Sequence, residues 1–132
     1  VYSPLAAGFL TGKYAKGQPI PKGTRFDIVP GHIDVYFNDR NFHVVGRLRA
    51  LGEELGVPVA KLAMAWVFRQ AGVASVLVGA RKRSHLDNAL EAFDYALDPT
   101  VERRMTEWLY EAFDGQPRLE RLRGAIHKFD AR

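Results

Sequence analysis

The chain has 132 residues, 47% of them hydrophobic and 26% charged, which is typical of a single folded domain and not of a disordered or fibrous protein. It contains no cysteine, so disulfides, thiolate zinc sites and cysteine nucleophiles are excluded. The net charge of +4 is a mild basic excess, and the Lys and Arg residues are not interleaved with aromatics as in nucleic-acid-binding modules.

No apolar run approaches the roughly 20 residues that span a bilayer. We therefore expect a cytoplasmic protein with no nucleic-acid and no membrane partner. Because the first residue is Val1 and not Met, we also expect a processed or partial chain.

Residues 1–3 are predicted to end a buried strand, because Pro4 and Gly8 then interrupt the pattern. Residues 12–39 are rich in proline and glycine, which predicts a long surface loop with little regular structure. Loops of this length are usually functional or mobile. Three aromatic residues of the loop are candidates for lining a substrate pocket, or equally for holding the loop in place: Phe26, Tyr36 and Phe37.

Two helices and a strand are predicted next. The spacing of Leu48, Leu51 and Leu55 indicates an amphipathic helix that stops at Gly56. Pro58 suits the first turn of a second helix, which we expect Gly72 to end. Its apolar stripe comprises Val59, Leu62, Ala63, Trp66 and Val67. Residues 74–78 form a short valine-rich run, which predicts a buried parallel strand.

Further helices are predicted after this strand. Ser84 and Asp87 have the spacing of a capping box, which would begin a helix. We expect that helix to turn Leu86, Leu90 and Phe93 inward. Asp98 and Pro99 are predicted to begin another helix, with Val101, Met105, Trp108, Leu109 and Ala112 on one face. A last amphipathic piece contains Leu119, Leu122, Ile126 and Phe129. The order strand, helix pair, strand, helix predicts the α/β class with two βα units.

Two blocks of sequence carry a more specific signal. The first is Tyr2-Ser3-Pro4-Leu5-Ala6-Ala7-Gly8 with Leu10-Thr11-Gly12-Lys13-Tyr14, and the second is Gly79-Ala80-Arg81 directly after Val76-Leu77-Val78. Together they resemble the nicotinamide-cofactor site of the aldo-keto reductases, and the resemblance runs from Val1 to about Trp108. It implies the C-terminal part of a (β/α)8 TIM barrel: the seventh and eighth βα units in residues 1–112, followed by a C-terminal helical extension in residues 113–132. The family's catalytic Asp, Tyr, Lys and His would precede Val1, so no catalytic residue is assigned.

The resemblance assigns cofactor-binding roles to the first block. Tyr2 would stack on the nicotinamide, although a tyrosine at a barrel rim is the ordinary alternative. Four residues resemble the pyrophosphate-binding loop: Ser3, Pro4, Leu5 and Gly8. Lys13 matches a lysine that contacts the phosphate region.

The second block is implied to bind the adenosine end of the cofactor. Gly79 would let the backbone approach the ligand, and Arg81 and Arg83 could meet a ribose 2′-phosphate. The alternative is a basic helix start exposed to water. The family commonly has glutamine and asparagine where this chain has His85 and Ala89, so His85 and Asn88 are candidates for the adenine contact. Arg81 favours NADP, and NAD stays open.

The resemblance therefore implies a reductase of aldehydes or ketones, with a small-molecule carbonyl as substrate and with this chain as its cofactor-holding portion. A non-catalytic nucleotide-binding or interaction subunit is the alternative, and a nonfunctional truncated product is a third. The four histidines lack ligand-like pairing, so no metal site is expected. A parallel sheet needs both faces covered and its edges paired, so two strands require the missing part of the barrel or self-association.

Overall fold

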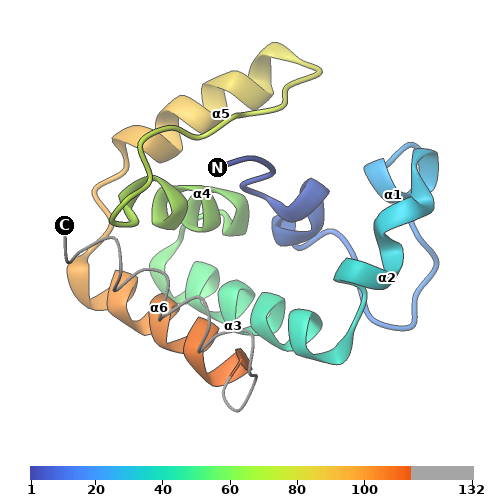
Figure 1. Cartoon of the computed structure of the whole chain (residues 1–132), viewed down its shortest axis with the longest axis horizontal. Helices are drawn as coiled ribbons and strands as arrows, with labels where there is room; N and C mark the ends of the chain where they lie inside the picture. The colour runs from blue at the N-terminus through green and yellow to red at the C-terminus, as the bar shows by residue number, and fades with distance from the viewer. Residues whose placement is uncertain (114–132) are drawn as a thin grey trace, which may run out of the picture. The chain divides into compact units, whose positions relative to one another are not determined.

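The structure is a computed structural model that describes residues 1–113. It contains two compact units, Val1–Asp98 and a second that begins at Pro99. The first unit contains two 3₁₀ helices and five α-helices: η1 (Ala6–Thr11), α1 (Arg25–Ile28), η2 (Pro30–His32), α2 (Ile33–Tyr36), α3 (Asp39–Leu55), α4 (Val59–Arg69) and α5 (Arg83–Asp94) (Figure 1). The second unit contributes α6 (Pro99–Phe113).

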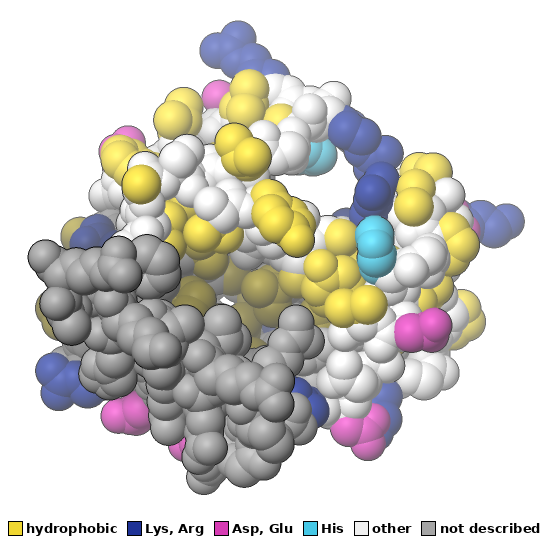
Figure 2. Space-filling view, viewed as in Figure 1, with side chains coloured by type: hydrophobic (Ala, Val, Ile, Leu, Met, Phe, Trp, Pro, Cys, Tyr) yellow, Lys and Arg dark blue, Asp and Glu magenta, His cyan; other side chains and the backbone are white. Residues whose placement is uncertain are grey.

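The two predicted strands are reduced to a single parallel β-bridge between Tyr2 and Leu77, and the described residues contain no longer strand. The Leu77 amide donates to the Val1 carbonyl at 2.8 Å, and the Val1 amino group donates to the Ser75 carbonyl at 2.7 Å. The expected burial is also wrong, because Tyr2 is 80% and Leu77 67% exposed. Parallel strands are normally covered on both faces and paired at their edges, and nothing in the described part of the chain does either here. Hydrophobic side chains are accordingly exposed at the surface (Figure 2).

Helices α3 and α4 form where the spacing of apolar residues predicts them. The Asn38 side chain accepts a hydrogen bond from the Asn41 amide at 3.0 Å and so caps the start of α3. Gly56 ends α3 in the left-handed conformation, with φ of 65°, as predicted. Helix α4 follows Pro58 but ends at Arg69, before the Gly72 that was expected to stop it.

Helix α5 departs from its prediction at its start. The helix begins at Arg83, and Ser84 therefore lies inside it instead of capping it. The cap position is Lys82, whose side chain makes no capping hydrogen bond, so the predicted capping box is wrong. The backbone of Lys82 is extended and not helical. The helix can therefore begin only at the next residue, Arg83.

The buried face of α5 is also not the predicted one. Its buried residues are Ala89 and Ala92, which pack with Met64 of α4. The three larger residues expected to point inward are exposed: Leu86, Leu90 and Phe93. Small side chains allow the two helices to approach closely, so the alanine face becomes the contact. Figure 1 shows α4 and α5 running beside each other.

The segment predicted as an irregular loop is folded around an aromatic core. It contains α1, η2 and α2, so the prediction of little regular structure is wrong. The buried members of this aromatic cluster are Phe9, Tyr14, Phe26 and Val45, with further apolar side chains packed around them. Phe37 lies in contact with Phe26, their ring centroids being 5.1 Å apart. Of the two roles open to the loop aromatics, holding the segment in place is the one that the structure supports for Phe26, which is only 1% exposed.

Helix α6 begins at Pro99, as the sequence predicts. Proline is favoured in a first helical turn because its missing N–H has no partner to lose there. Met105 and Trp108, from the predicted apolar face, are buried. The predicted amphipathic piece with Leu119, Leu122, Ile126 and Phe129 lies outside the described residues, as does all but the first residue of the predicted extension 113–132.

Candidate functional site

The fold brings the two sequence blocks together although they lie more than seventy positions apart in the chain. The bridge between Tyr2 and Leu77 joins the start of the first block to the run that precedes the second. Leu5 and Val78 then pack against the same α4 cluster around Met64. Two separate contacts therefore place the start of the first block beside the run that precedes the second.

The first block is a tight turn with unusual backbone conformations. Ser3, Ala6 and Ala7 have positive φ angles of 53°, 50° and 56°, and Gly8 has φ of 90°. Non-glycine residues in this region cost of order 1–3 kcal/mol each and cluster at functional sites. The turn closes on itself, because the Ala6 amide donates to the Ser3 carbonyl at 2.8 Å and the Gly8 amide to the Leu5 carbonyl at 2.9 Å. The Ala6 and Gly8 amides are therefore already hydrogen-bonded inside the turn and are not available to an anion. The positive charge that could attract an anion here belongs to a side chain.

That side chain is Lys13. A Cβ atom added to Gly8 would lie 3.3 Å from Lys13 Nζ, so the missing side chain of Gly8 leaves the room that the ammonium group uses. Lys13 Nζ also lies 5.2 Å from the centroid of the Tyr14 ring, within the range of a cation–π interaction. The ammonium group beside the glycine of this turn places a positive charge where an anion could approach the backbone closely.

The remaining residues of the first block differ in what they can offer a ligand. The Tyr2 ring is almost fully exposed, so its face is accessible for stacking. Ser3 is exposed as well, whereas Pro4 and Leu5 are half-buried. The Leu5 side chain packs on the α4 cluster, which leaves only its backbone for a ligand.

The second block is open and basic. A Cβ atom added to Gly79 would meet nothing within 4 Å, so no packing contact explains the glycine. Arg81 and Arg83 are exposed, and Arg83 Nε lies 3.9 Å from an Asp87 carboxylate oxygen, four residues along α5. An exposed pair at this distance holds the guanidinium only weakly, so both arginines can turn to a phosphate.

His85 and Asn88 are both exposed on the first turns of α5. The observed partner of His85 is the backbone of the loop, since the Arg81 amide donates to His85 Nδ1 at 3.4 Å. His85 thus lies beside the basic loop that precedes the helix. No contact of Asn88 distinguishes it from other exposed residues of α5.

One residue near the site was not singled out in the sequence. Arg49 of α3 donates from Nη2 to the carbonyl oxygens of Gly12 and Tyr14, the latter at 3.3 Å. Lys13 is the residue between them. An arginine on the polar side of an amphipathic helix carries no sequence signal for such a role, because its partners are backbone atoms 37 and 35 positions away.

The described residues provide no group of three or more His, Asp or Glu side chains that could hold a metal ion. Within residues 1–113, no helix is both long enough and apolar enough to cross a membrane.

The fold of the described residues resembles part of a solved glycerol dehydrogenase structure. The chain superposes on a glycerol dehydrogenase from Gluconobacter oxydans with a TM-score of 0.62 and 24% identity, covering 84% of this chain and 33% of that one. The family model for the aldo/keto reductases matches residues 1–109. The chain belongs to the aldo/keto reductase family, which confirms the resemblance found in its two sequence blocks.

The curated relatives that match this chain are of two kinds, a channel subunit and a reductase. A probable voltage-gated potassium channel subunit beta from Oryza sativa subsp. japonica is 39% identical over 100 residues, which are 70% of this chain and 29% of that protein. An L-glyceraldehyde 3-phosphate reductase from Escherichia coli O157:H7 is 31% identical over 105 residues, covering 76% of this chain and 30% of the reductase. The chain thus spans less than a third of the length of these curated relatives.

Proposed function

We propose that this chain is the cofactor-holding portion of an NADP-dependent oxidoreductase that reduces an aldehyde or ketone. The observation that supports this most is the convergence of the two blocks through the Tyr2–Leu77 bridge and the shared packing of Leu5 and Val78. An extended ligand with several phosphate groups would lie across the two blocks, with its aromatic end at Tyr2, its pyrophosphate at Lys13 and its further phosphate at Arg81 and Arg83.

The available groups fit a nicotinamide dinucleotide. Lys13, beside the open space at Gly8, would hold the pyrophosphate, and Tyr2 would stack on the nicotinamide ring. Arg81 and Arg83 would bind a 2′-phosphate, because their planar forks match phosphate oxygens. The cofactor supplies the hydride for the carbonyl when bound. The chain's own residues would bind and orient the cofactor, and the proton-donating group would belong to the family's catalytic set, to which no residue of this chain is assigned.

The exposed Tyr2–Leu77 edge supports a further part of the proposal, that more strands cover it in the working protein. These strands would come from the same polypeptide or from a second copy of the chain, since unpaired parallel edges are rarely left open. The intact mass and N-terminal sequence of the natural product distinguish the two. A product with additional barrel strands before Val1 supports the first source, and one that begins at Val1 excludes it.

The test of cofactor binding is a titration of the natural-length protein with NADPH and with NADH, followed by fluorescence. We expect NADPH to bind more tightly, and we expect Arg81→Met to remove most of the difference while leaving NADH unchanged. Lys13→Met should weaken both. Binding of neither nucleotide by the folded protein would refute the proposal.

A second candidate is a non-catalytic subunit that uses the same site to sense the cofactor. The observation that favours it is that two plant potassium channel subunits beta are 38–39% identical to this chain, more than the 31% of the Escherichia coli O157:H7 reductase, although a subunit beta from Schizosaccharomyces pombe is 29% identical. Oxidation of bound NADPH in the presence of aldehydes separates the candidates. Carbonyl-dependent loss of the NADPH absorbance supports the reductase, and tight binding without turnover supports the subunit.

A further inference from the structure

Arg49 connects α3 to the segment that carries Lys13 of the candidate pyrophosphate site. Its Nη2 group donates to the carbonyl oxygens of Gly12 and Tyr14, on both sides of Lys13. Hydrogen bonds from a guanidinium are charge-assisted and therefore stronger than neutral ones. The backbone on both sides of Lys13 is thus held by hydrogen bonds to Arg49.

The conformation of Gly12 is adapted to this arginine. Gly12 has φ of 77°, and a Cβ atom added to it would lie 3.2 Å from Arg49 Nε. A side chain at position 12 would therefore be strained in its backbone and would crowd the guanidinium. This contact explains why a glycine precedes Lys13 in the first block. The missing side chain of Gly12 leaves room for Arg49, which in turn hydrogen-bonds the residues on both sides of the lysine.

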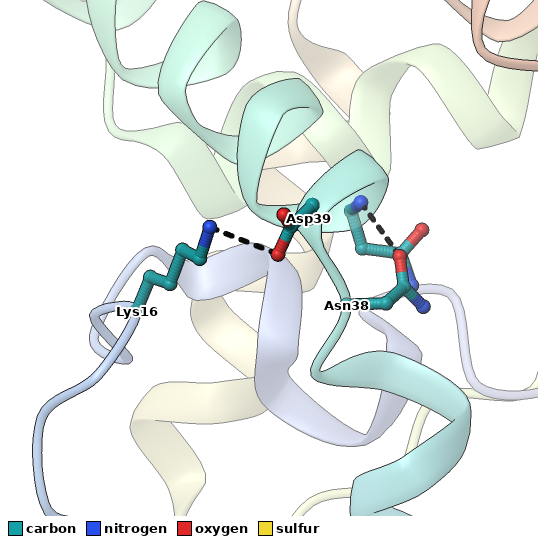
Figure 3. Close-up of polar contacts among 4 residues, drawn as sticks. Lys16, Asn38 and Asp39 are labelled. Atoms are coloured by element: carbon teal, nitrogen blue, oxygen red, sulfur yellow. Dashed lines mark hydrogen bonds and ion pairs between the residues drawn. The ribbon is translucent and has the colours of Figure 1, made fainter.

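A second contact ties the same segment to the beginning of α3. Lys16 Nζ lies 2.9 Å from an Asp39 carboxylate oxygen, next to the Asn38 cap (Figure 3). Both side chains of this ion pair are more than half exposed, and such pairs contribute little because water screens them. The Arg49 hydrogen bonds are charge-assisted and go to the residues on both sides of Lys13, so they act directly on its backbone.

We propose that Arg49 is a positioning residue: by holding the carbonyls of Gly12 and Tyr14, it keeps the Lys13 ammonium over Gly8, where an anion is bound. This inference rests on the proposed cofactor site. Lys13 has a long flexible side chain, and immobilising its backbone reduces the conformational freedom lost when it meets a phosphate. Without Arg49, the Lys13 ammonium group would spend less time in its position beside Gly8.

The test measures dissociation constants of the natural-length protein for NADPH and for adenosine 2′-monophosphate, which carries the 2′-phosphate but neither phosphate of the pyrophosphate. We expect Arg49→Met to weaken NADPH about fivefold to tenfold, a loss of the size of one ordinary hydrogen bond. The monophosphate should change less than about twofold, because it has no group for Lys13 to bind. Equal weakening of both ligands would overturn the inference, because it would indicate general damage to the fold.

A double-mutant cycle with Lys13 decides whether Arg49 acts through it. We expect Lys13→Met and the combination of Lys13→Met with Arg49→Met to bind NADPH equally, since a positioned group that is absent cannot be misplaced. Additive losses would mean that Arg49 contacts the ligand directly, and would overturn the inference. If Arg49→Met does not fold, Arg49→Gln is used in the same cycle, because glutamine keeps a polar end but is shorter and has no positive charge.

Two matched controls complete the design. Lys16→Met removes one positive charge from the same segment, so its expected lack of effect excludes a simple loss of long-range attraction. Arg69→Met removes another arginine–carbonyl hydrogen bond, from Arg69 Nη2 to the Tyr95 carbonyl at 2.8 Å, at a place away from both blocks. We expect it to lower stability without changing NADPH affinity.

Failure of the unaltered protein to bind NADPH would refute the proposed function, whereas binding that is insensitive to Arg49→Met would refute this inference alone.

Discussion

The hydroxyl of Tyr14 provides a sharp test of how the segment between η1 and α3 is packed. The side chain is 2% exposed, and the hydroxyl has no hydrogen-bond partner among the described residues. Its ring, in contrast, is well placed: the centroids of Phe26 and Phe37 lie 5.2 and 5.3 Å away. The ring is therefore expected to stabilise the fold and the hydroxyl to destabilise it.

The magnitudes can be worked out separately for the two parts of the side chain. Leaving a buried hydroxyl unpaired costs about 1–3 kcal/mol, so Tyr14→Phe should raise the free energy of unfolding by about 1 kcal/mol. Tyr14→Leu loses three aromatic pairs, with Phe9, Phe26 and Phe37, worth about 0.5–1.5 kcal/mol each, together with the ring face under Lys13. We expect it to lower the free energy of unfolding by at least about 1 kcal/mol.

The assay is urea unfolding of the natural-length protein, with the unaltered protein and both variants measured side by side. Near-ultraviolet circular dichroism checks that Tyr14→Phe keeps the native packing. A Tyr14→Phe variant that is less stable than the parent would refute the reasoning, because the hydroxyl would then be hydrogen-bonded in solution. The opposite signs expected for phenylalanine and leucine make the pair more informative than either substitution alone.

Three further substitutions test the packing elsewhere in the first unit, each by the same urea unfolding. Phe26→Ala should cost about 3–5 kcal/mol, as for other buried aromatics, and a loss below about 1 kcal/mol would show that the segment before α3 is not packed. Gly52→Ala should cost about 1–3 kcal/mol by overpacking, because the new Cβ would lie 2.7 Å from the Val57 carbonyl oxygen; unchanged stability would mean that the turn after α3 can shift freely. Glu91→Gln breaks the 3.2 Å pair with Lys61 but should cost less than about 1 kcal/mol because the glutamate is largely exposed, and a larger loss would reveal a role for α5 beyond this ion pair.

The local features of this fold were predictable from the sequence. The end of α3 at Gly56 and the start of α6 at Pro99 follow from backbone preferences of single residues, which act within one helical turn. The candidate site was predictable for a similar reason. Its residues lie in two short blocks, and the order of residue types within each block carries the resemblance on which the family assignment was made.

The features that depend on partners were not predictable in the same way. Nothing in residues 74–78 tells whether other strands cover them, so a run typical of a buried strand became one exposed bridge at Leu77. The face of α5 that is buried was decided by α4, where Met64 accepts Ala89 and Ala92 and leaves the larger residues outside.

The sequence by itself therefore determined the family, the end of α3, the start of α6 and the identity of the candidate cofactor residues, because each depends on adjacent positions of the chain. Only the tertiary structure decided that the two blocks meet, that the aromatic residues of the long segment form a core, and that Arg49 holds the carbonyls beside Lys13. These are contacts between residues far apart in the chain, and their existence depends on which surfaces the fold brings within a few ångströms of each other.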